Sequence, residues 1–555
     1  MTSKQKLSFI GILILAVFFR LYMIGQMPGG LFPDEAANGL DINSMQQGQL
    51  QPFYERGNGR EALFFYMLWG SVEVLGKTPL AHHLVSALVG ILAVIVTFFL
   101  TRRLVLLADE GGNKDRATWV ALLAMLFIAT SSWHIVLSRT AFRANLIPLF
   151  GALTFYLIIA CVQAKTKGHR YLLAILSGAS LALGFYSYIA FRIMVPLLFI
   201  LVLWPLMVDL LAKPRFVQLK KYFAPAMLAV VAFVIVMLPL ANYFYTHPGS
   251  FVGRSGQVSV FNPELNQGDL VGTVAQVTGL SVKAYFRAGD LNWRHNISGE
   301  PFLSIIISPF FALGLILVLG LAIRYTFLPH RHRRDWVYFL VAGWFTAMLI
   351  PVITTAEGIP HGLRSIGTIP VVFIIASFGL YWAVERAHEI TNWYWAKLAP
   401  WKQQFILFLK TLMIASFVAA LSAQAYINYF VYAANSPEYF YAFRSDLTEV
   451  SNYLNEHGSK TNTYLVLDKF SIQTVDYMTF IDGPNPADPK NNPYQQVDPE
   501  NVWQLTGLKP GDKIVFTQSS LFDIKKFKEI YPTARLDTEQ RNQFNQTVLA
   551  VYIYP

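Results

Sequence analysis

Residues 8–25 read SFIGILILAVFFRLYMIG, an apolar run of about 18 residues in which Arg20 is the single charged side chain. Its length approaches the roughly 20 residues that a helix needs to cross the hydrocarbon core of a bilayer. About eight residues further on, where such a helix has just reached the membrane surface, the chain continues with Pro33-Asp34-Glu35. Ionisable side chains are costly near lipid, about 2.5–3.5 kcal/mol each at a helix centre and less towards the surface. The two adjacent carboxylates therefore indicate a functional site.

The composition places the whole chain in the same class. Of its 555 residues, 54% are hydrophobic and 14% are charged, and the mean hydropathy is +0.42. Soluble globular domains carry about 25% charged residues. The sequence therefore predicts a polytopic membrane protein and excludes an ordinary soluble globule.

Cysteine and charge exclude two further classes. The single cysteine, Cys161, lies inside an apolar run, so no intrachain disulfide and no cysteine-based metal site can form. The net charge of +11 could indicate nucleic-acid binding, but the basic residues lie mostly in short connections between apolar runs. That distribution is typical of membrane topology, and no nucleic-acid partner is expected.

Apolar runs of sufficient length predict about eleven membrane spans. They lie near residues 8–25, 80–100, 118–137, 145–163, 171–187, 193–211, 223–243, 302–323, 335–355, 365–384 and 404–427. With a cytoplasmic amino terminus, all five inner connections are basic, as the positive-inside rule requires. Their basic residues are Arg102, Arg103, Lys114 and Arg116, then Lys165, Lys167 and Arg170, then Lys213, Arg215, Lys220 and Lys221, then Arg324, Arg331, Arg333 and Arg334, then Arg386, Lys397 and Lys402.

This orientation places two long loops and the carboxyl-terminal tail outside. The loops are residues 26–79 and 244–301, and they belong with the spans to a membrane region at 1–430. The tail, 431–555, is richer in Asp, Asn, Gln and Pro and is predicted to be a small soluble α/β domain. Short apolar stretches at 463–467 and 513–516 predict strands, patterns near 445–457 and 522–530 predict helices, and 482–500 is predicted to be a loop.

Charged residues also gather on the predicted outer side. The first loop carries Arg56, Arg60 and Glu61, and three outer turns read SRTAFRAN (138–145), YSYIAFR (186–192) and EGIPHGLR (357–364). The second long loop adds Arg254, Arg287, Asp290, Arg294 and Glu300. The planar fork of arginine suits phosphate oxygens, and a nearby carboxylate can accept a proton from an incoming hydroxyl or amine. Together they describe sugar transfer from a lipid-phosphate carrier.

These residues also carry a resemblance. With the acidic pair, the stretch NGREALFFY (58–66) and the strings SRTAFRAN and PHGLR, the membrane region resembles the GT-C superfamily of membrane glycosyltransferases. It is similar to the branch that contains protein O-mannosyltransferases and the lipid A aminoarabinose transferase. The resemblance implies an all-α membrane bundle, a polyprenyl-phosphate sugar donor, inversion at the anomeric carbon, Asp34 as the catalytic base and Glu35 as its neighbour. The donor phosphate is expected at Arg60, Arg139, Arg143, Arg192, His361 and Arg364.

A divalent cation is a further implication of the resemblance. Glu61 lies where lipid A transferases have an acidic residue near a metal, which makes it a candidate metal ligand. Their Lys-Pro-Pro continuation is replaced here by Ala62-Leu63-Phe64. Metal binding and a lipid A acceptor therefore both stay open.

Each assignment has a structural alternative. Asp34 and Glu35 could cap a helix amino terminus, and Arg139 and Arg143 could extend to lipid headgroups. Arg192 could be an interfacial anchor. The structural alternative for His361 and Arg364 is that they only fix a turn.

The sequence thus predicts a multi-pass cell-membrane glycosyltransferase whose active site and carboxyl-terminal domain face away from the cytoplasm. The acceptor is a protein, a glycan or a glycolipid, and the transferred sugar a hexose or a pentose. A flippase for lipid-linked saccharides is the main alternative, although transport sites tend to lie near the bilayer midplane. An oligosaccharide polymerase or an oligosaccharyltransferase is a lesser one, because the Trp-Trp-Asp string expected of the latter is absent.

Overall fold

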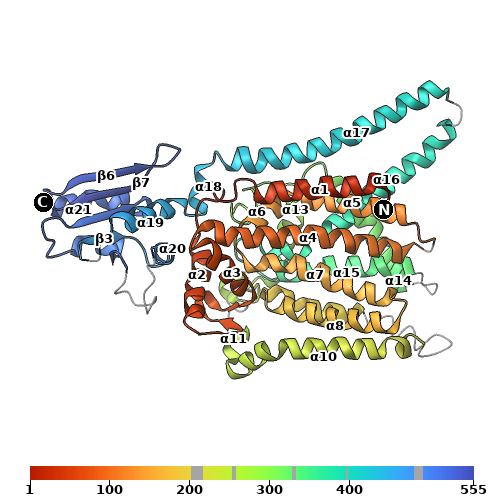
Figure 1. The fold of residues 1–555 in the computed structure, drawn as a ribbon, viewed down its shortest axis with the longest axis horizontal. Coiled ribbons are helices and arrows are strands. Elements are labelled where there is room, and N and C mark those ends of the chain that lie inside the picture. The colour runs from red at the N-terminus through yellow and green to blue at the C-terminus, as the bar shows by residue number, and fades with distance from the viewer. Residues whose placement is uncertain are drawn as a thin grey trace. The chain divides into compact units, whose positions relative to one another are not determined.

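The computed structural model describes residues 1–109, 111–201, 217–252, 258–327, 333–395, 398–459, 461–479 and 492–555 (Figure 1). The chain forms two compact units. The first unit comprises Met1–Tyr22, Ser86–Ser138 and Phe142–Tyr432. The second unit comprises Met23–Val85, Arg139–Ala141 and Ala433–Pro555. The first long loop of the sequence and the tail therefore belong to one unit.

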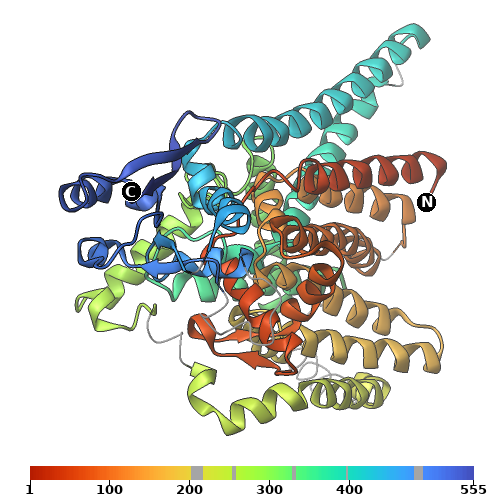
Figure 2. The ribbon, with the colours of Figure 1, turned by 60° about the vertical axis from the view of Figure 1, so that its left-hand side comes forward.

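The first unit is built from long helices. In chain order its elements are α1 (Ser3–Leu21), α4 (Pro79–Ala108), α5 (Lys114–Ala129), α6 (Ser132–Arg139), η2 (Arg143–Asn145), α7 (Leu146–Gln163), α8 (Lys167–Phe185), η3 (Ile189–Ile193), α10 (Val217–Thr246), α11 (Pro248–Val252), α12 (Pro263–Asn266), α13 (Leu270–Ala284), α14 (Ser308–Phe327), α15 (Arg333–Ile353), η4 (Arg364–Thr368), α16 (Val371–Trp395), α17 (Pro400–Tyr426) and η5 (Ile427–Ala433). The start of α4 (79–85), the last residue of α6 (Arg139) and the last residue of η5 (Ala433) belong to the second unit. Helices α7, α8 and α10 run side by side in the bundle, as both views show (Figures 1 and 2).

Among the described residues, seven helices are long and apolar enough to cross a membrane, and eight if α5 and α6, bent by 61°, count as one span. The other predicted spans also coincide with helices. Two of them, at 8–25 and 171–187, coincide with α1 and α8, in which polar residues dilute the apolar run. The third begins in the short apolar helix Ile189–Leu201, and the rest of 193–211 lies outside the described residues. The polytopic helical bundle is confirmed, and the count of eleven stays a prediction.

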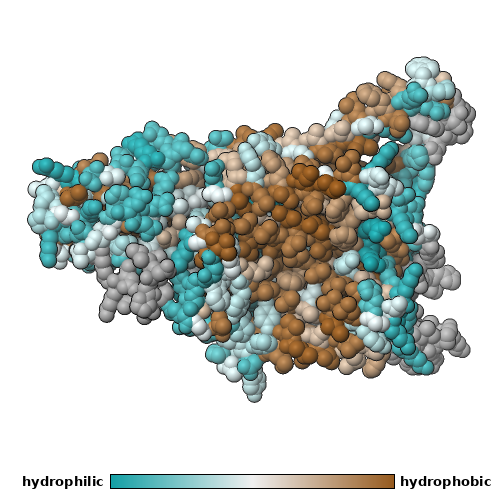
Figure 3. Space-filling model, in the orientation of Figure 1, coloured by the Kyte–Doolittle hydropathy of each residue, from teal (hydrophilic) through white to brown (hydrophobic). Residues whose placement is uncertain are grey.

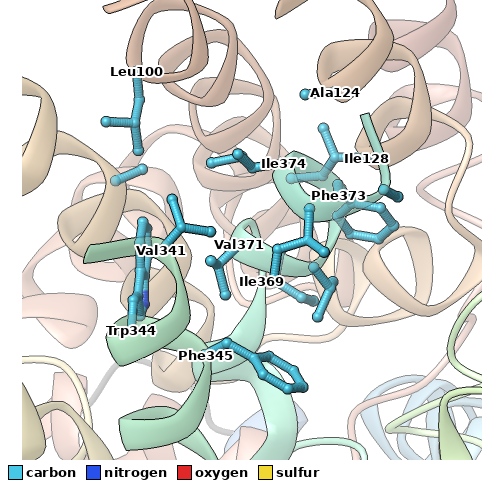
Figure 4. Packing of buried hydrophobic residues seen from close by; sticks show 14 of the residues in the cluster. Leu100, Ala124, Ile128, Val341, Trp344, Phe345, Ile369, Val371, Phe373 and Ile374 are labelled. Carbon is cyan, nitrogen blue, oxygen red and sulfur yellow. The ribbon is translucent and has the colours of Figure 1, made fainter. Parts of the chain in front are cut away.

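The core of the first unit surrounds the beginning of α16. Residues Val371–Ala376 are completely buried there. Figure 4 shows Val371 and Ile374 near Val341 of α15, with Leu100 of α4 and Ile128 of α5 in the same cluster. Helices α14 and α16 approach closely because a Cβ at Gly314 would lie 2.0 Å from the Ile375 carbonyl oxygen. Small residues permit such backbone contact between membrane helices, where packing replaces the hydrophobic driving force.

The surface of the first unit agrees with a membrane environment. Apolar side chains cover the middle of its helices and hydrophilic side chains gather at helix ends (Figure 3). Helix α17 is the extreme case, since only 6% of its most apolar window is buried inside the structure. An apolar helix with so little protein contact is suited to face lipid.

The second unit combines the first long loop with the carboxyl-terminal tail. Its elements are α2 (Pro33–Gln46), β1 (Phe53–Tyr54), η1 (Arg56–Asn58), β2 (Arg60–Glu61), α3 (Leu63–Leu75), α18 (Pro437–Ala442), α19 (Ser445–His457), β3 (Thr463–Val466), α20 (Ile472–Met478), β4 (Gln495–Val497), η7 (Pro499–Gln504), β5 (Lys513–Thr517), η8 (Gln518–Asp523), α21 (Ile524–Ile530), β6 (Arg535–Arg541) and β7 (Thr547–Ile553). Strands β1 and β2 pair antiparallel, and the other five form one sheet.

The five-stranded sheet has the order β4-β3-β5-β7-β6, with parallel pairs around β3 and antiparallel pairs around β7. Alternate residues face opposite sides, as the period of a strand requires: Leu465 and Val515 pack with α19, whereas Val466 and Phe516 pack with α21. The β6–β7 hairpin is visible in blue in Figure 2. The predicted α/β fold is confirmed.

The predicted loop at 482–500 is wrong in part. Residues Gln495–Val497 form β4, which pairs in parallel with β3 at the edge of the sheet. The strand is short and two of its three residues are Gln, so no apolar pattern marks it. Residues 482–491 of this prediction lie outside the described part of the chain.

Candidate active site

Helix α2 presents its two amino-terminal carboxylates to different surroundings. Pro33 occupies the first turn, where its fixed φ suits a helix start and its missing N–H costs nothing. Successive helical side chains point about 100° apart. As a result Asp34 is exposed, whereas Glu35 is completely buried.

The Asp34 side chain is exposed. Within the described part of the chain its side chain has no hydrogen bond or ion pair, and only its backbone carbonyl is contacted, by Arg60 at 3.5 Å. The sequence prediction of a base at this position needs such an available carboxylate. Capping, the structural alternative, falls to the neighbouring residue instead.

Glu35 fixes the start of α2. One carboxylate oxygen, Oε2, accepts the Phe32 N–H at 3.0 Å, and Oε1 accepts the Ala141 N–H at 2.6 Å and lies 3.4 Å from His83 Nε2. Burial alone would raise the pKa of Glu35, but the hydrogen bond and charge of His83 and the two backbone amides outweigh it and hold the pKa below its usual value. These contacts suit a positioning residue that stays ionised.

Arg60 holds the other side of α2. Its guanidinium is buried, donates to Asn38 Oδ1 at 2.7 Å and to the Asp41 carboxylate, and lies 5.2 Å from the centre of the Phe65 ring. Asn38 and Asp41 follow Asp34 at helical spacing, so one arginine secures the face of α2 that begins with Asp34. Arg60, which the sequence predicts to bind phosphate, therefore contacts and stabilises α2 in the structure.

The tail of the chain packs directly on α2. Tyr477 of α20 is completely buried, and its hydroxyl lies 2.9 Å from His82 Nε2. A Cβ at Gly39 would lie 2.3 Å from the Tyr477 ring. Thr474 adds a hydrogen bond to the Leu31 carbonyl at 3.0 Å. The carboxyl-terminal segment thus packs against α2, the helix that carries Asp34, and stabilises its position.

We expect Gly39→Ala to displace α2 and destabilise the second unit by about 1–3 kcal/mol, because the added methyl overpacks the Tyr477 ring. Thermal unfolding and turnover would both report the change. Gly70→Ala is the matched control: this exposed helical glycine has open space around its Cβ position, and the substitution should be neutral or stabilising. Equal thermal stability and turnover in the two variants would contradict the proposed packing of Tyr477 on α2.

Arg139 is also buried in the second unit. Its Nε and Nη2 donate to the Met27 carbonyl at 3.2 and 2.6 Å. The alternative of an arginine that extends to lipid headgroups does not suit a completely buried guanidinium. Its contacts fix the loop that leads from α1 to α2.

Three other predicted phosphate ligands lie in the first unit, on short helices that precede or join its long helices. Arg143 of η2 stacks over Tyr188 at 5.3 Å, and Arg192 of η3 donates to the Phe251 carbonyl at 2.7 Å. Arg364 begins η4 and pairs with Glu357 at 3.1 Å. Segments η3 and η4 contact one another, which brings two of the three cationic turns together.

Glu61, the candidate metal ligand, is buried in β2 opposite Phe53. Among the described residues it belongs to no group of three potential ligands. Metal binding by Glu61 stays a prediction, and no catalytic step is assigned to a metal there.

One group of three potential ligands is found among the described residues, and it lies in the first unit. Asp290, His295 and His361 offer ligand atoms within 4.8 Å of one another. The sequence identified His361 only as a phosphate ligand and Asp290 only as a loop charge. The residues are up to 71 positions apart, so no local spacing could have revealed the cluster.

Other supporting residues were also missed by the sequence reasoning. Asn38 and Asp41 could have been found from their helical spacing relative to Asp34. His82, His83 and Tyr477 could not, because only the tertiary fold brings them to α2.

The fold has known counterparts. No family model and no curated protein matches the chain. The chain is similar to ArnT from Cupriavidus metallidurans bound to undecaprenyl phosphate, with a TM-score of 0.59 and 12% identity over 99% of this chain and 98% of that one. It is also similar to the archaeal oligosaccharyltransferase AglB from Archaeoglobus fulgidus in complex with an inhibitory peptide and a dolichol-phosphate, with a TM-score of 0.52 and 11% identity over 100% and 74%. The resemblance found in the sequence is confirmed at the level of the fold: the chain has the fold of the GT-C membrane glycosyltransferases.

Proposed function

We propose that this protein is an integral-membrane glycosyltransferase that moves a sugar from a polyprenyl-phosphate donor to an extracytoplasmic acceptor with inversion. The observation that carries the proposal is the contrast within α2: Asp34 is exposed and without a side-chain bond among the described residues, while Glu35, Asn38 and Asp41 are buried and bonded. A catalytic base must be held in a fixed position and must have a carboxylate that is available to accept a proton. The lipid phosphates bound to ArnT and AglB support the donor class.

In the proposed reaction Asp34 accepts the proton of an acceptor hydroxyl or amine. The lone pair of the deprotonated acceptor attacks the anomeric carbon of the sugar. The bond between that carbon and the phosphate oxygen breaks, and the oxygen keeps the electron pair. The acceptor gains a glycosidic bond, and polyprenyl phosphate leaves with an additional negative charge. General-base help of this kind contributes roughly 10²–10⁴ in rate. Glu35 acts through position, by fixing the first turn of α2.

The leaving phosphate requires cations. We assign this role to Arg143, Arg192 and Arg364, whose guanidinium groups are less deeply enclosed than those of Arg60 and Arg139. Arginine presents a planar fork of donors that matches phosphate oxygens. His361, three residues before Arg364, stays a proposed participant through its place in the same turn.

Single substitutions of these arginines should weaken donor binding. A charge-assisted hydrogen bond contributes about 1.5–3 kcal/mol, so Arg143→Ala, Arg192→Ala or Arg364→Ala should each raise the donor Kd by roughly 10- to 150-fold. Binding of a non-transferable donor analogue by the purified protein measures this directly. Arg386→Ala, on an exposed arginine of α16, should leave the Kd unchanged. Wild-type affinity in all three variants would remove the assigned phosphate role.

The function itself is tested by incubating the purified protein with a panel of polyprenyl-phosphate sugars and cell-envelope extract. We expect one donor to be consumed, with release of sugar-free polyprenyl phosphate detected by mass spectrometry. Movement of an intact donor across proteoliposome membranes, without lipid-phosphate release, would instead establish a flippase. The same assay identifies the sugar, and the labelled product identifies the acceptor as a protein, a glycan or a glycolipid.

The proposed reaction takes place on the extracytoplasmic face. Support comes from the basic inner connections of the sequence, which follow the positive-inside rule for a cytoplasmic amino terminus. Asp34 follows α1 and therefore lies on the opposite side of that span from Lys4 and Lys6. The membrane-embedded donor and the acceptor are the expected partners.

A further inference from the structure

Two loops of the first unit bring together three metal-binding side chains. Asp290 and His295 lie between α13 and α14, and His361 lies between α15 and η4. His295 Nδ1 is 2.9 Å and His361 Nδ1 is 3.9 Å from Asp290 Oδ2. The two imidazole rings stack with their centres 4.6 Å apart. Asp290 and His295 are buried, and 18% of the His361 side chain is exposed, which leaves a path from solvent to the cluster.

The first of these loops is held in one conformation by its own hydrogen bonds. The Asp290 carbonyl accepts the Gly299 N–H at 3.0 Å, and Asp290 Oδ1 accepts the Asn292 N–H at 2.8 Å. The Asn296 side chain closes the loop by donating to the Glu300 carbonyl at 2.6 Å. The carboxylate and the His295 ring are thereby oriented before any ligand binds, as an efficient metal site requires.

The second loop is pressed against the first. A Cβ at Gly362 would lie 2.9 Å from the His295 carbonyl oxygen, so glycine permits the close approach. The Gly362 N–H donates to Asp290 Oδ2 at 2.7 Å, and its carbonyl accepts the Trp133 indole N–H at 3.2 Å. These contacts of Gly362 place His361 opposite His295.

We propose that Asp290, His295 and His361 bind a single divalent metal ion of the zinc type. Two imidazoles and one carboxylate are ligands that Zn²⁺ prefers. Ligand atoms in a tetrahedral zinc site lie about 3.3–3.6 Å from one another, and the present separations of up to 4.8 Å need only a small contraction of side chains. The ion takes the place of the contact between His295 Nδ1 and Asp290 Oδ2, and the ring proton moves to Nε2.

Three protein ligands leave one position of a tetrahedral ion open, as in catalytic rather than closed structural zinc sites. The open position takes water or an anionic oxygen. The ion also ties the connection between α13 and α14 (285–307) to the turn that leads into η4, which begins with Arg364. The proposal concerns this chain's affinity for metal and stands independently of the sugar-transfer reaction, because it is measured without substrate.

The test uses the full-length purified protein, stripped by a chelator and titrated with Zn²⁺ alone. Calorimetry should give one site per chain, and elemental analysis one bound zinc. Co²⁺ in place of Zn²⁺ should show the visible absorption of a tetrahedral site. We expect His361→Gln to weaken binding by at least about tenfold. His247→Gln is the matched control, since this histidine is exposed and lies at the end of α10.

Absence of Zn²⁺ binding at micromolar concentration would overturn the proposal and leave the cluster as a hydrogen-bonded clamp between two loops. Equal affinity in wild type, Asp290→Asn and His361→Gln would overturn it as well, by placing the metal elsewhere. Asp290 also holds Gly362, so Asp290→Asn can impair folding. In that event His361→Gln decides the outcome, because the His361 side chain is partly exposed and the backbone N–H of Gly362 keeps its hydrogen bond to Asp290.

Discussion

Asp34→Asn should abolish turnover while leaving the protein folded and able to bind its donor. Asparagine preserves the shape of the side chain and removes only the ability to accept a proton. The exposed carboxylate makes no side-chain hydrogen bond among the described residues, so the change in stability should stay within about 0.5 kcal/mol. Turnover, measured as release of polyprenyl phosphate, should fall by roughly 10²–10⁴ or more. Donor affinity, measured with a non-transferable analogue, should not change.

Glu529→Gln provides the control for Asp34→Asn. It also neutralises an exposed carboxylate of the second unit, in α21, and should behave as wild type. An Asp34→Asn variant with wild-type turnover would show that the base lies elsewhere and would reduce Asp34 to a residue at the start of a helix.

Arg60→Met should destabilise the second unit by about 3–5 kcal/mol, because it leaves the buried Asp41 carboxylate without its main partner. The substitution also removes the hydrogen bond to Asn38 and the packing on Phe65. Turnover should fall with stability, since α2 loses its support. Donor affinity of the molecules that remain folded should be near that of wild type. Thermal unfolding followed together with analogue binding separates these effects.

The chain offers a close control for that experiment. Arg56 pairs with the same Asp41 carboxylate at 2.9 Å but is 43% exposed, so Arg56→Met should cost less than about 1 kcal/mol. The double variant Arg60→Met/Asp41→Leu should regain part of the lost stability, because both buried charges are gone. Unchanged stability in Arg60→Met together with weakened donor binding would favour the role as a phosphate ligand that the sequence predicts.

Sequence patterns identified the parts of the fold that local chemistry determines. Apolar length predicted the membrane helices, and short apolar stretches predicted β3 and β5. The same reasoning missed β4, β6 and β7. Strands β4 and β6 are polar, and hydrogen bonding to neighbouring strands defines them. The apolar stretch Thr547–Ile553 of β7 was not identified as a strand. Position after the first span was enough to single out Asp34 and Glu35.

The direction in which each charged side chain points could not be read from sequence. Glu35, Arg60 and Arg139 were candidates for chemistry, and the structure buries all three in contacts that support α2 and its preceding loop. Burial depends on segments distant in sequence, such as the turn at 139–141 that supplies an amide to Glu35. Local spacing carries no information about such contacts.

The carboxyl-terminal segment contacts both α2 and the loop that precedes it. Besides Tyr477, Phe470 packs its ring edge to face against Phe32, with ring centres 5.6 Å apart. Thr448 donates to the Gly29 carbonyl at 3.1 Å. The loop that leads into α2 and the helix itself are therefore held by residues more than 400 positions away. We interpret this segment as a support for the position of Asp34.

The central claim is that Asp34 acts as a base in a single displacement, and the configuration of the product tests it most directly. Two-dimensional NMR of the glycosylated acceptor, compared with the donor, reports the anomeric configuration on both sides of the reaction. A base that activates the acceptor gives inversion in every turnover. Retention of configuration would contradict the account, because it requires a glycosyl-enzyme intermediate and would make a carboxylate the nucleophile.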